Sequence, residues 1–357
     1  MMPSHVDTAL ALLARPRTAR VHLARNSSRL HHPGLCRLLI DRSHELRFSD
    51  AHEMVNVAVL AVEIATRCSI PPRELADLLS DAWCALANGL KVRGLLRASD
   101  KAFRRSATLE AEGTDRPVSR CVRLERFASL KIRQARFSEA SCILSSVVHT
   151  RRQLGDPLPV AHALLTRAIA ESEGGAHLQG LRLTTEAMTL VPVGNNPRLA
   201  LLLRLHGINC LTDLGCPNDA LCWLDRLRPL SSACDDPIIA IRIRWLTGKA
   251  LAACGGERND LAAEIEYRGG WEQAVGRGLP YEAAKIALEL GVFYADRGRY
   301  QPLPSLVADA VPLFNALGLS RDAMASRLLA RSATEFQAAR RLLIEAGRHL
   351  DRSRRAA

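Results

Sequence analysis

The sequence predicts an all-α protein built from stacked pairs of antiparallel helices. Three observations predict this class: aromatic residues make up only 4% of the 357 residues, Leu, Ala, Arg and Glu dominate, and apolar residues recur at helical spacing. Few aromatics disfavour a β-sandwich or barrel, whereas Leu, Ala, Arg and Glu are good helix formers. A hydrophobic content of 48% in a chain of this length is enough for a large core.

The stretch AWCALANGLKVRGLLRASDKAF shows the predicted unit. Its first apolar and small residues fall at i, i+3, i+4 and i+7, which places them on one face of a helix: Trp83, Leu86, Ala87 and Leu90. Gly94 then marks a turn. A second helix follows with small and aromatic residues on one face: Ser99, Phe103 and Ser106. The stretch therefore predicts two antiparallel helices, with Ala87 and Ser99 as gaps that receive larger neighbours.

This unit recurs along the chain with a period of roughly 40 to 42 residues. The small residue that opens each second helix falls at Ser99, Ala140, Gly180, Ala220, about Ala262 and about Leu303. The fifth copy fits only if GGERND holds a small insertion. A helical hairpin cannot bury its own apolar stripe, so the period predicts that neighbouring hairpins stack.

The repeated residues resemble the tetratricopeptide repeat (TPR). Its signature is an aromatic residue, Leu-Gly and Tyr on the first helix, then Ala, Phe and a closing Pro on the second. Leu290, Gly291 and Tyr294 form a sharp copy, and the resemblance covers roughly residues 35 to 345. Because the period is about 40 rather than 34, the chain is more similar to long-period arrays of bacterial regulatory proteins. The resemblance implies a right-handed superhelical α-solenoid of about six to seven hairpins.

The sequence predicts three parts: a basic N-terminal segment over residues 1–33, a TPR-like repeat domain over 34–345, and a frayed tail over 346–357. An atypical first hairpin is expected between about Gly34 and Pro72, with Ser49 or Asp50 capping its second helix. Residues 321–350 have the charged faces expected of a capping helix or hairpin.

The formal net charge of +12 suggests an acidic partner, but only five of the 49 basic residues are Lys, a bias that a GC-rich genome also produces. Residues 15–32 carry five Arg and no acid. This segment is interpreted as a basic helix or linker, with a nucleic-acid-binding arm as the alternative. The ten scattered Cys indicate buried thiols of a cytoplasmic protein, and no apolar run is long enough for a membrane span.

Motifs of common active sites are missing: the sequence holds no GxGxxG, GxxxxGK[ST], HExxH or GxSxG. His206, Cys210 and Asp213 share a helix face, so a Cys-His nucleophile pair is conceivable. Small or polar side chains facing a groove explain the same residues better. The sequence therefore predicts a protein that is not an enzyme, with no catalytic residue, metal site or cofactor.

The resemblance also implies a binding surface, because the first helices of TPR hairpins line a concave groove. Carried onto this chain, the groove residues are Asn88, Lys91, Arg126, Ser129, Arg133, His162, Thr166, His206, Asn209, Arg242, Lys249 and Lys285. Asn can bond a peptide backbone, and Arg can hold a carboxylate with two hydrogen bonds. We expect a protein or peptide partner, with an acidic segment or a C-terminal carboxylate as the natural ligand.

The resulting hypothesis is a non-catalytic scaffold that binds a protein or peptide segment in bacterial signalling or transcriptional control. The alternative is a ligand-sensing regulatory domain that contacts nucleic acid through the basic N-terminal segment.

Overall fold

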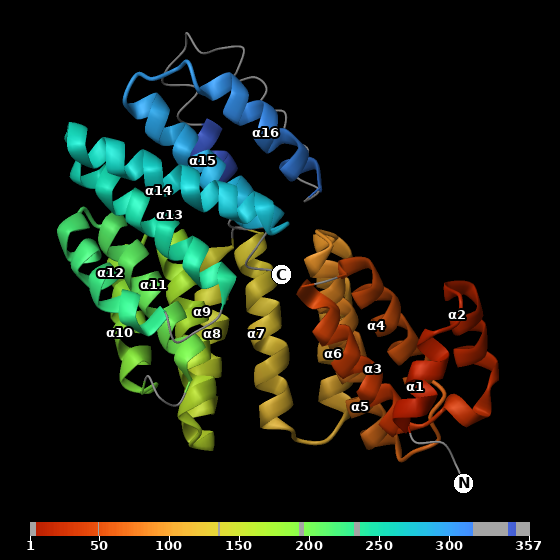
Figure 1. The fold of residues 1–357 in the computed structure, drawn as a ribbon. Helices are drawn as coiled ribbons and strands as arrows, with labels where there is room; N and C mark the ends of the chain where they lie inside the picture. Colours follow the sequence, from red (N-terminus) through yellow and green to blue (C-terminus); the bar gives the residue numbers. More distant parts are fainter. Residues whose placement is uncertain are drawn as a thin grey trace. The chain divides into compact units, whose positions relative to one another are not determined.

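The structure, a computed structural model, describes residues 5–48, 50–134, 136–192, 196–231, 236–316 and 342–347. Throughout these ranges the regular elements are helices (Figure 1), which confirms the predicted all-α class. The chain divides into two compact units between Arg136 and Phe137. In the described part, no helix combines the length and hydropathy needed to cross a bilayer.

The first unit is formed by seven α-helices in its described residues. They are α1 (His5–Leu13), α2 (Arg17–Asn26), α3 (Pro33–Glu45), α4 (Ala51–Ala65), α5 (Pro72–Val92), α6 (Leu96–Glu112) and α7 (Pro117–Arg133). Helices α3 and α4 form the predicted first hairpin, α5 and α6 form the second, and α7 packs on both α5 and α6. Asp50 caps α4 by accepting hydrogen bonds from His52 N and Glu53 N at 2.9 and 2.8 Å. Ser49, the other candidate cap, lies outside the described residues.

The N-terminal segment folds as part of this unit. Helix α1 packs on α3, and α2 packs on α4. Ala9, Leu12 and Ala24 are buried in the same apolar cluster as Leu35 and Leu39. This agrees with the interpretation of a basic helix leading into the repeats, whereas the domain limits at residues 33 and 345 stay predictions.

The second unit continues the repeats. Its helices are α8 (Phe137–Leu154), α9 (Pro157–Glu173), α10 (His177–Thr189), α11 (Pro197–Asp213), α12 (Pro217–Ser231), α13 (Pro237–Cys254), α14 (Glu257–Gly276), α15 (Pro280–Asp296) and α16 (Leu303–Ala316). Helices α9 to α16 pair in chain order as four hairpins (Figure 1). The two helices predicted as the hairpin after α5 and α6, α7 and α8, belong to different units, and α8 packs on α9.

Small residues mark the close approach of the two helices in several hairpins, as the period predicts. The Ser99 hydroxyl donates to the Ala87 carbonyl at 2.8 Å, and both residues are fully buried. At Gly180, a Cβ atom would lie 2.0 Å from Ser172 Oγ and 3.0 Å from Ala168 O, so a larger residue would crowd α9 at this point. In the fifth copy the buried contact residue is Ala263 rather than Ala262, which corrects that prediction by one residue.

An Asx-Pro step opens three successive first helices. Asp156, Asn196 and Asp236 accept hydrogen bonds from backbone N–H groups of the first turn, at 3.1, 3.0 and 2.9 Å. Each is followed by a Pro that begins its helix, where the missing N–H costs nothing. These Asx-Pro steps are evenly spaced in the sequence, and their spacing is a further signal of the repeat period.

Several predicted features fall on residues that the structure does not describe. They are most of the capping segment 321–350 and most of the tail over 346–357. Within these segments, only residues 342–347 are described, as a helix.

Candidate functional site

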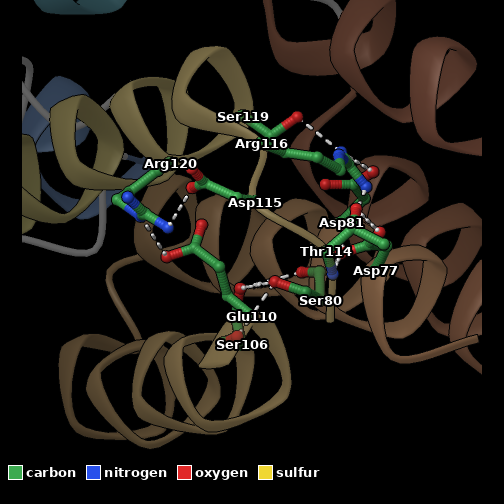
Figure 2. Close-up of polar contacts among 10 residues, drawn as sticks. All are labelled: Asp77, Ser80, Asp81, Ser106, Glu110, Thr114, Asp115, Arg116, Ser119 and Arg120. Carbon is green, nitrogen blue, oxygen red and sulfur yellow. Dashed lines mark hydrogen bonds and ion pairs between the residues drawn. The ribbon is translucent and has the colours of Figure 1, made fainter. Parts of the chain in front are cut away.

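A polar clamp holds the start of α7 against α5 (Figure 2). The Asp77 carboxylate on α5 accepts hydrogen bonds from Thr114 N at 3.1 Å and from Thr114 Oγ1 at 2.5 Å. Arg116 pairs with Asp81 at 2.6 Å, and Arg120 pairs with Asp115 at 2.9 Å. Hydrogen bonds with an ionised partner are stronger than neutral ones, so the clamp fixes how α7 lies on α5.

The backbone at Gly113 lies so close to the Asp77 carboxylate that a side chain at position 113 would clash with it. A Cβ atom at position 113 would lie 2.1 Å from Asp77 Oδ1, which is already bonded to Thr114 N. We therefore expect Gly113→Ala to lower the free energy of unfolding by about 1–3 kcal/mol, because the added methyl displaces the carboxylate. Gly276→Ala is the control, since no atom lies within 4 Å of its Cβ position. Urea unfolding checks both, and a Gly113→Ala variant as stable as Gly276→Ala would contradict the clamp.

The faces of α5 and α7 bring predicted groove residues together. Lys91 Nζ on α5 donates to Ser129 Oγ on α7 at 3.1 Å, and Arg126 Nη1 lies 3.5 Å from Cys84 Sγ. Lys91 is only 4% exposed, while Arg126, Ser129 and Arg133 are half-buried. Asn88, which was expected in the same groove, is also buried. The predicted neighbours therefore meet, but Asn88 and Lys91 lie deeper than groove-lining side chains were expected to lie.

Basic side chains are concentrated at this contact. Burial, together with the charges of Arg133, Arg47 and Arg126, holds the pKa of Lys91 well below its ordinary value. Burial and the charges of Arg126, Arg47 and Lys91 lower the pKa of His44 to about 3. We call these five residues the basic cluster: His44, Arg47, Lys91, Arg126 and Arg133. Sequence analysis missed His44 and Arg47, which lie on and just after α3, because it assigned no groove residue to the atypical first hairpin.

In the second unit, predicted groove residues satisfy one another. Lys249 Nζ on α13 pairs with Asp213 Oδ1 on α11 at 2.6 Å and donates to Asn209 Oδ1 at 2.8 Å. Asn209 Nδ2 in turn donates to Asp213 Oδ2 at 3.0 Å. The positive charge of Lys249 is therefore balanced by the Asp213 carboxylate at this point. This corrects the expectation of a mostly basic lining on α11 and α13.

His206 and Cys210 lie close together but do not form an activated nucleophile. Cys210 Sγ lies 3.6 Å from His206 Nε2, and Ser172 Oγ lies 3.2 Å from the same sulfur. Burial raises the pKa of the Cys210 thiol to about 11 and lowers the pKa of His206 to about 4. At pH 7 both groups are neutral, whereas a Cys-His nucleophile needs a thiolate beside an imidazolium.

The remaining predicted groove residues lie on α9, α13 and α15. His162 is exposed, and the Thr166 hydroxyl donates to the His162 carbonyl at 3.0 Å within α9. Arg242 on α13 and Lys285 on α15 line one pocket between these two helices. None of these contacts tests ligand binding, so the site residues stay predictions.

Three arginines of the N-terminal segment form ion pairs within the first unit. Arg17 and Arg20 both pair with Glu53 on α4, and Arg25 pairs with Glu63 at 2.6 Å. A phosphate backbone would have to compete with these carboxylates. The structure therefore favours a structural role for this part of the basic segment.

Comparisons with known proteins identify the fold. No protein-family model matches the sequence, and no curated protein matches it. Among solved structures, a Rap protein complexed with competence and sporulation factor is similar, with a TM-score of 0.65 and 11% identity over 88% of this chain and 89% of that chain.

Two further structures are similar over most of their length. Aspartyl phosphate phosphatase F from Bacillus subtilis has a TM-score of 0.54 and 10% identity over 95% of this chain and 96% of that chain. The apo form of RapI has a TM-score of 0.52 and 12% identity over 95% and 97%. Identities this low show the fold alone, a TPR-like array of helical hairpins.

Proposed function

We propose that this chain is a non-catalytic TPR-like scaffold that binds an acidic segment of a protein or peptide at the basic cluster of the first unit. We further propose that it is a long-period regulatory array acting in the cytoplasm, in bacterial signalling or transcriptional control. The nine Cys that the structure describes are free thiols, which fits a reducing compartment. The fold is one in which a Rap protein has been seen complexed with competence and sporulation factor.

The observation that carries the proposal is the environment of Lys91. Its side chain is removed from water and surrounded by the charges of Arg47, Arg126 and Arg133. At an effective dielectric constant of about 20, two unit charges 4 Å apart interact by about 4 kcal/mol. A carboxylate placed at the cluster would be attracted by the guanidinium groups of Arg47, Arg126 and Arg133, so an acidic ligand is favoured over a neutral one of the same shape.

A non-catalytic role is supported by the neutral state of the Cys210 and His206 pair. One neighbour in fold is named a phosphatase, but at 10% identity the name brings no residue to this chain. The N-terminal ion pairs with Glu53 and Glu63 weaken the alternative of nucleic-acid contact through that segment.

The test is a fluorescence-anisotropy titration of the full chain with a labelled Glu-rich peptide and with its Gln-substituted counterpart. We expect the Glu peptide to bind at least about tenfold more tightly at low salt and to lose this advantage as ionic strength rises. Equal affinities for the two peptides would contradict the proposal. A short DNA duplex that binds more tightly than the Glu peptide would favour the nucleic-acid alternative.

A further inference from the structure

Helix α6 of the first unit presents exposed basic side chains along one face. Arg97, Lys101, Arg104 and Arg105 are all exposed, and their positions i, i+4, i+7 and i+8 share one side of a helix. Four helical residues rise by about 6 Å, so the charges from Arg97 to Arg105 extend over about 12 Å. We call these four residues the α6 basic row. Arg93, in the turn before the helix, is exposed as well.

Carboxylates do not balance this row. Arg104 Nε pairs with Asp100 Oδ2 at 2.8 Å, but Asp100 also pairs with Lys131 Nζ at 3.1 Å. Among the described residues, the other three members of the row have no ion-pair or hydrogen-bond partner for their side chains. A general excess of Arg does not explain this, because arginines elsewhere in the first unit meet carboxylates, as Arg25 meets Glu63. The row therefore carries at least three unbalanced positive charges.

The side chains around the row favour a partner that is bound by charge alone. The structure describes all of α6, and no large apolar side chain of this helix is exposed; Leu95 is exposed in the preceding turn. Protein interfaces need buried apolar or aromatic anchors, helices on membrane surfaces need an apolar face, and single-stranded nucleic acids need exposed aromatic rings. The phosphate backbone of a duplex needs only cations, which release its condensed counterions.

We propose that the α6 basic row is a contact surface for the phosphate backbone of double-stranded DNA, with Arg97, Lys101 and Arg105 each facing a phosphate. Phosphate contacts carry no sequence information, so this surface binds duplexes of any sequence. It differs from the N-terminal segment, where three arginines already pair with Glu53 and Glu63. It also shares no residue with the basic cluster, so the inference does not depend on the binding of an acidic segment there.

The test is an anisotropy titration of the full chain with two labelled DNA duplexes of about 20 bp and unrelated sequence, between about 50 and 200 mM salt. We expect the same affinity for both sequences. Three phosphate contacts predict that the logarithm of the binding constant falls with the logarithm of salt concentration at a slope of about −2.7. Binding should therefore weaken about fortyfold over this range.

A triple variant locates the effect on α6. Arg97→Gln with Lys101→Gln and Arg105→Gln removes three charges and keeps a good helix former at each position. We expect duplex binding at low salt to weaken at least about tenfold and its salt dependence to be largely lost, because the phosphate contacts are gone. Circular dichroism checks that the variant is folded.

The matched control is Arg182→Gln with Arg226→Gln and Arg258→Gln. These three residues are exposed and lie one each on α10, α12 and α14, so they form no row on one helix. Each triple variant removes three positive charges and lowers the formal net charge from +12 to +9. We expect the control to keep the affinity and the salt slope of the unaltered chain.

The inference is overturned if neither duplex binds below about 1 mM at low salt, or if the control loses as much affinity as the α6 variant. Retained duplex binding by the α6 variant would also overturn it, by placing the DNA contact elsewhere in the chain. Phosphatidylserine vesicles that bind more tightly than the duplexes would assign the row to a membrane instead. The basic cluster is unaltered in both variants, so titration of the same proteins with the Glu-rich peptide tests the acidic-segment proposal separately.

Discussion

The double variant Arg126→Glu with Arg133→Glu is expected to bind the Glu-rich peptide about a hundredfold more weakly than the unaltered chain, a loss of about 2.8 kcal/mol. Both side chains belong to the basic cluster and shift the pKa of buried Lys91. Each reversal replaces an attraction for a carboxylate by a repulsion, and the partial burial of the site limits screening by salt.

The matched control is Arg97→Glu with Arg105→Glu, two exposed residues on α6. Both double variants lower the formal net charge from +12 to +8, so a general effect of protein charge would appear equally in both. Anisotropy titration at physiological ionic strength measures the difference. Equal weakening by the two variants would show that the peptide senses net charge rather than the basic cluster.

The second large effect is expected for Ala87→Trp, which should lower the free energy of unfolding by about 3 kcal/mol or more. Ala87 is fully buried at the contact of α5 with α6, and it packs in one cluster with Phe103 and Leu130. Its carbonyl also accepts the Ser99 hydroxyl at 2.8 Å. An indole at this position has no space unless the two helices separate.

Ala98→Trp is the control for this change, because Ala98 is exposed in the first turn of α6. Its effect should stay within about 0.7 kcal/mol, the range of intrinsic helix propensity. Urea unfolding followed by circular dichroism measures both variants. Similar losses at the two positions would contradict the helix phase assigned from the sequence.

The repeat pattern was predictable because close helix packing restricts residue type locally. Ser99, Ala140, Gly180 and Ala220 were identified as small residues at helix contacts, and all four lie buried in the first turn of α6, α8, α10 or α12. In the fifth copy, Gly255 and Gly256 both take positive φ, and α14 begins at Glu257, in step with the starts of α8, α10 and α12. The buried contact residue, Ala263, lies about one turn further into its helix than the contact residues of the earlier copies do.

The candidate site was predictable only in part. The sequence placed Lys91 and Ser129 in the same groove, and likewise Asn209 and Lys249. Each of these two pairs comes from neighbouring first helices, and each forms a hydrogen bond in the structure. The sequence could not show that Asp213 neutralises Lys249, since that pair joins residues on different helices at a distance set by packing. It also could not place His44 and Arg47 beside Lys91, because α3 meets α5 through tertiary contacts alone.

The sequence by itself determined the helix class, the hairpins and their period of about 40 residues, because these follow from apolar spacing, turn glycines and small contact residues within one repeat. The tertiary structure decided which basic side chains lie beside a carboxylate and which lie beside other basic side chains. Lys249 and Lys91 are both lysines near the ends of first helices, yet one meets a carboxylate and the other lies among arginines. Burial and partners, which arise only when helices pack, set the electrostatics of a side chain.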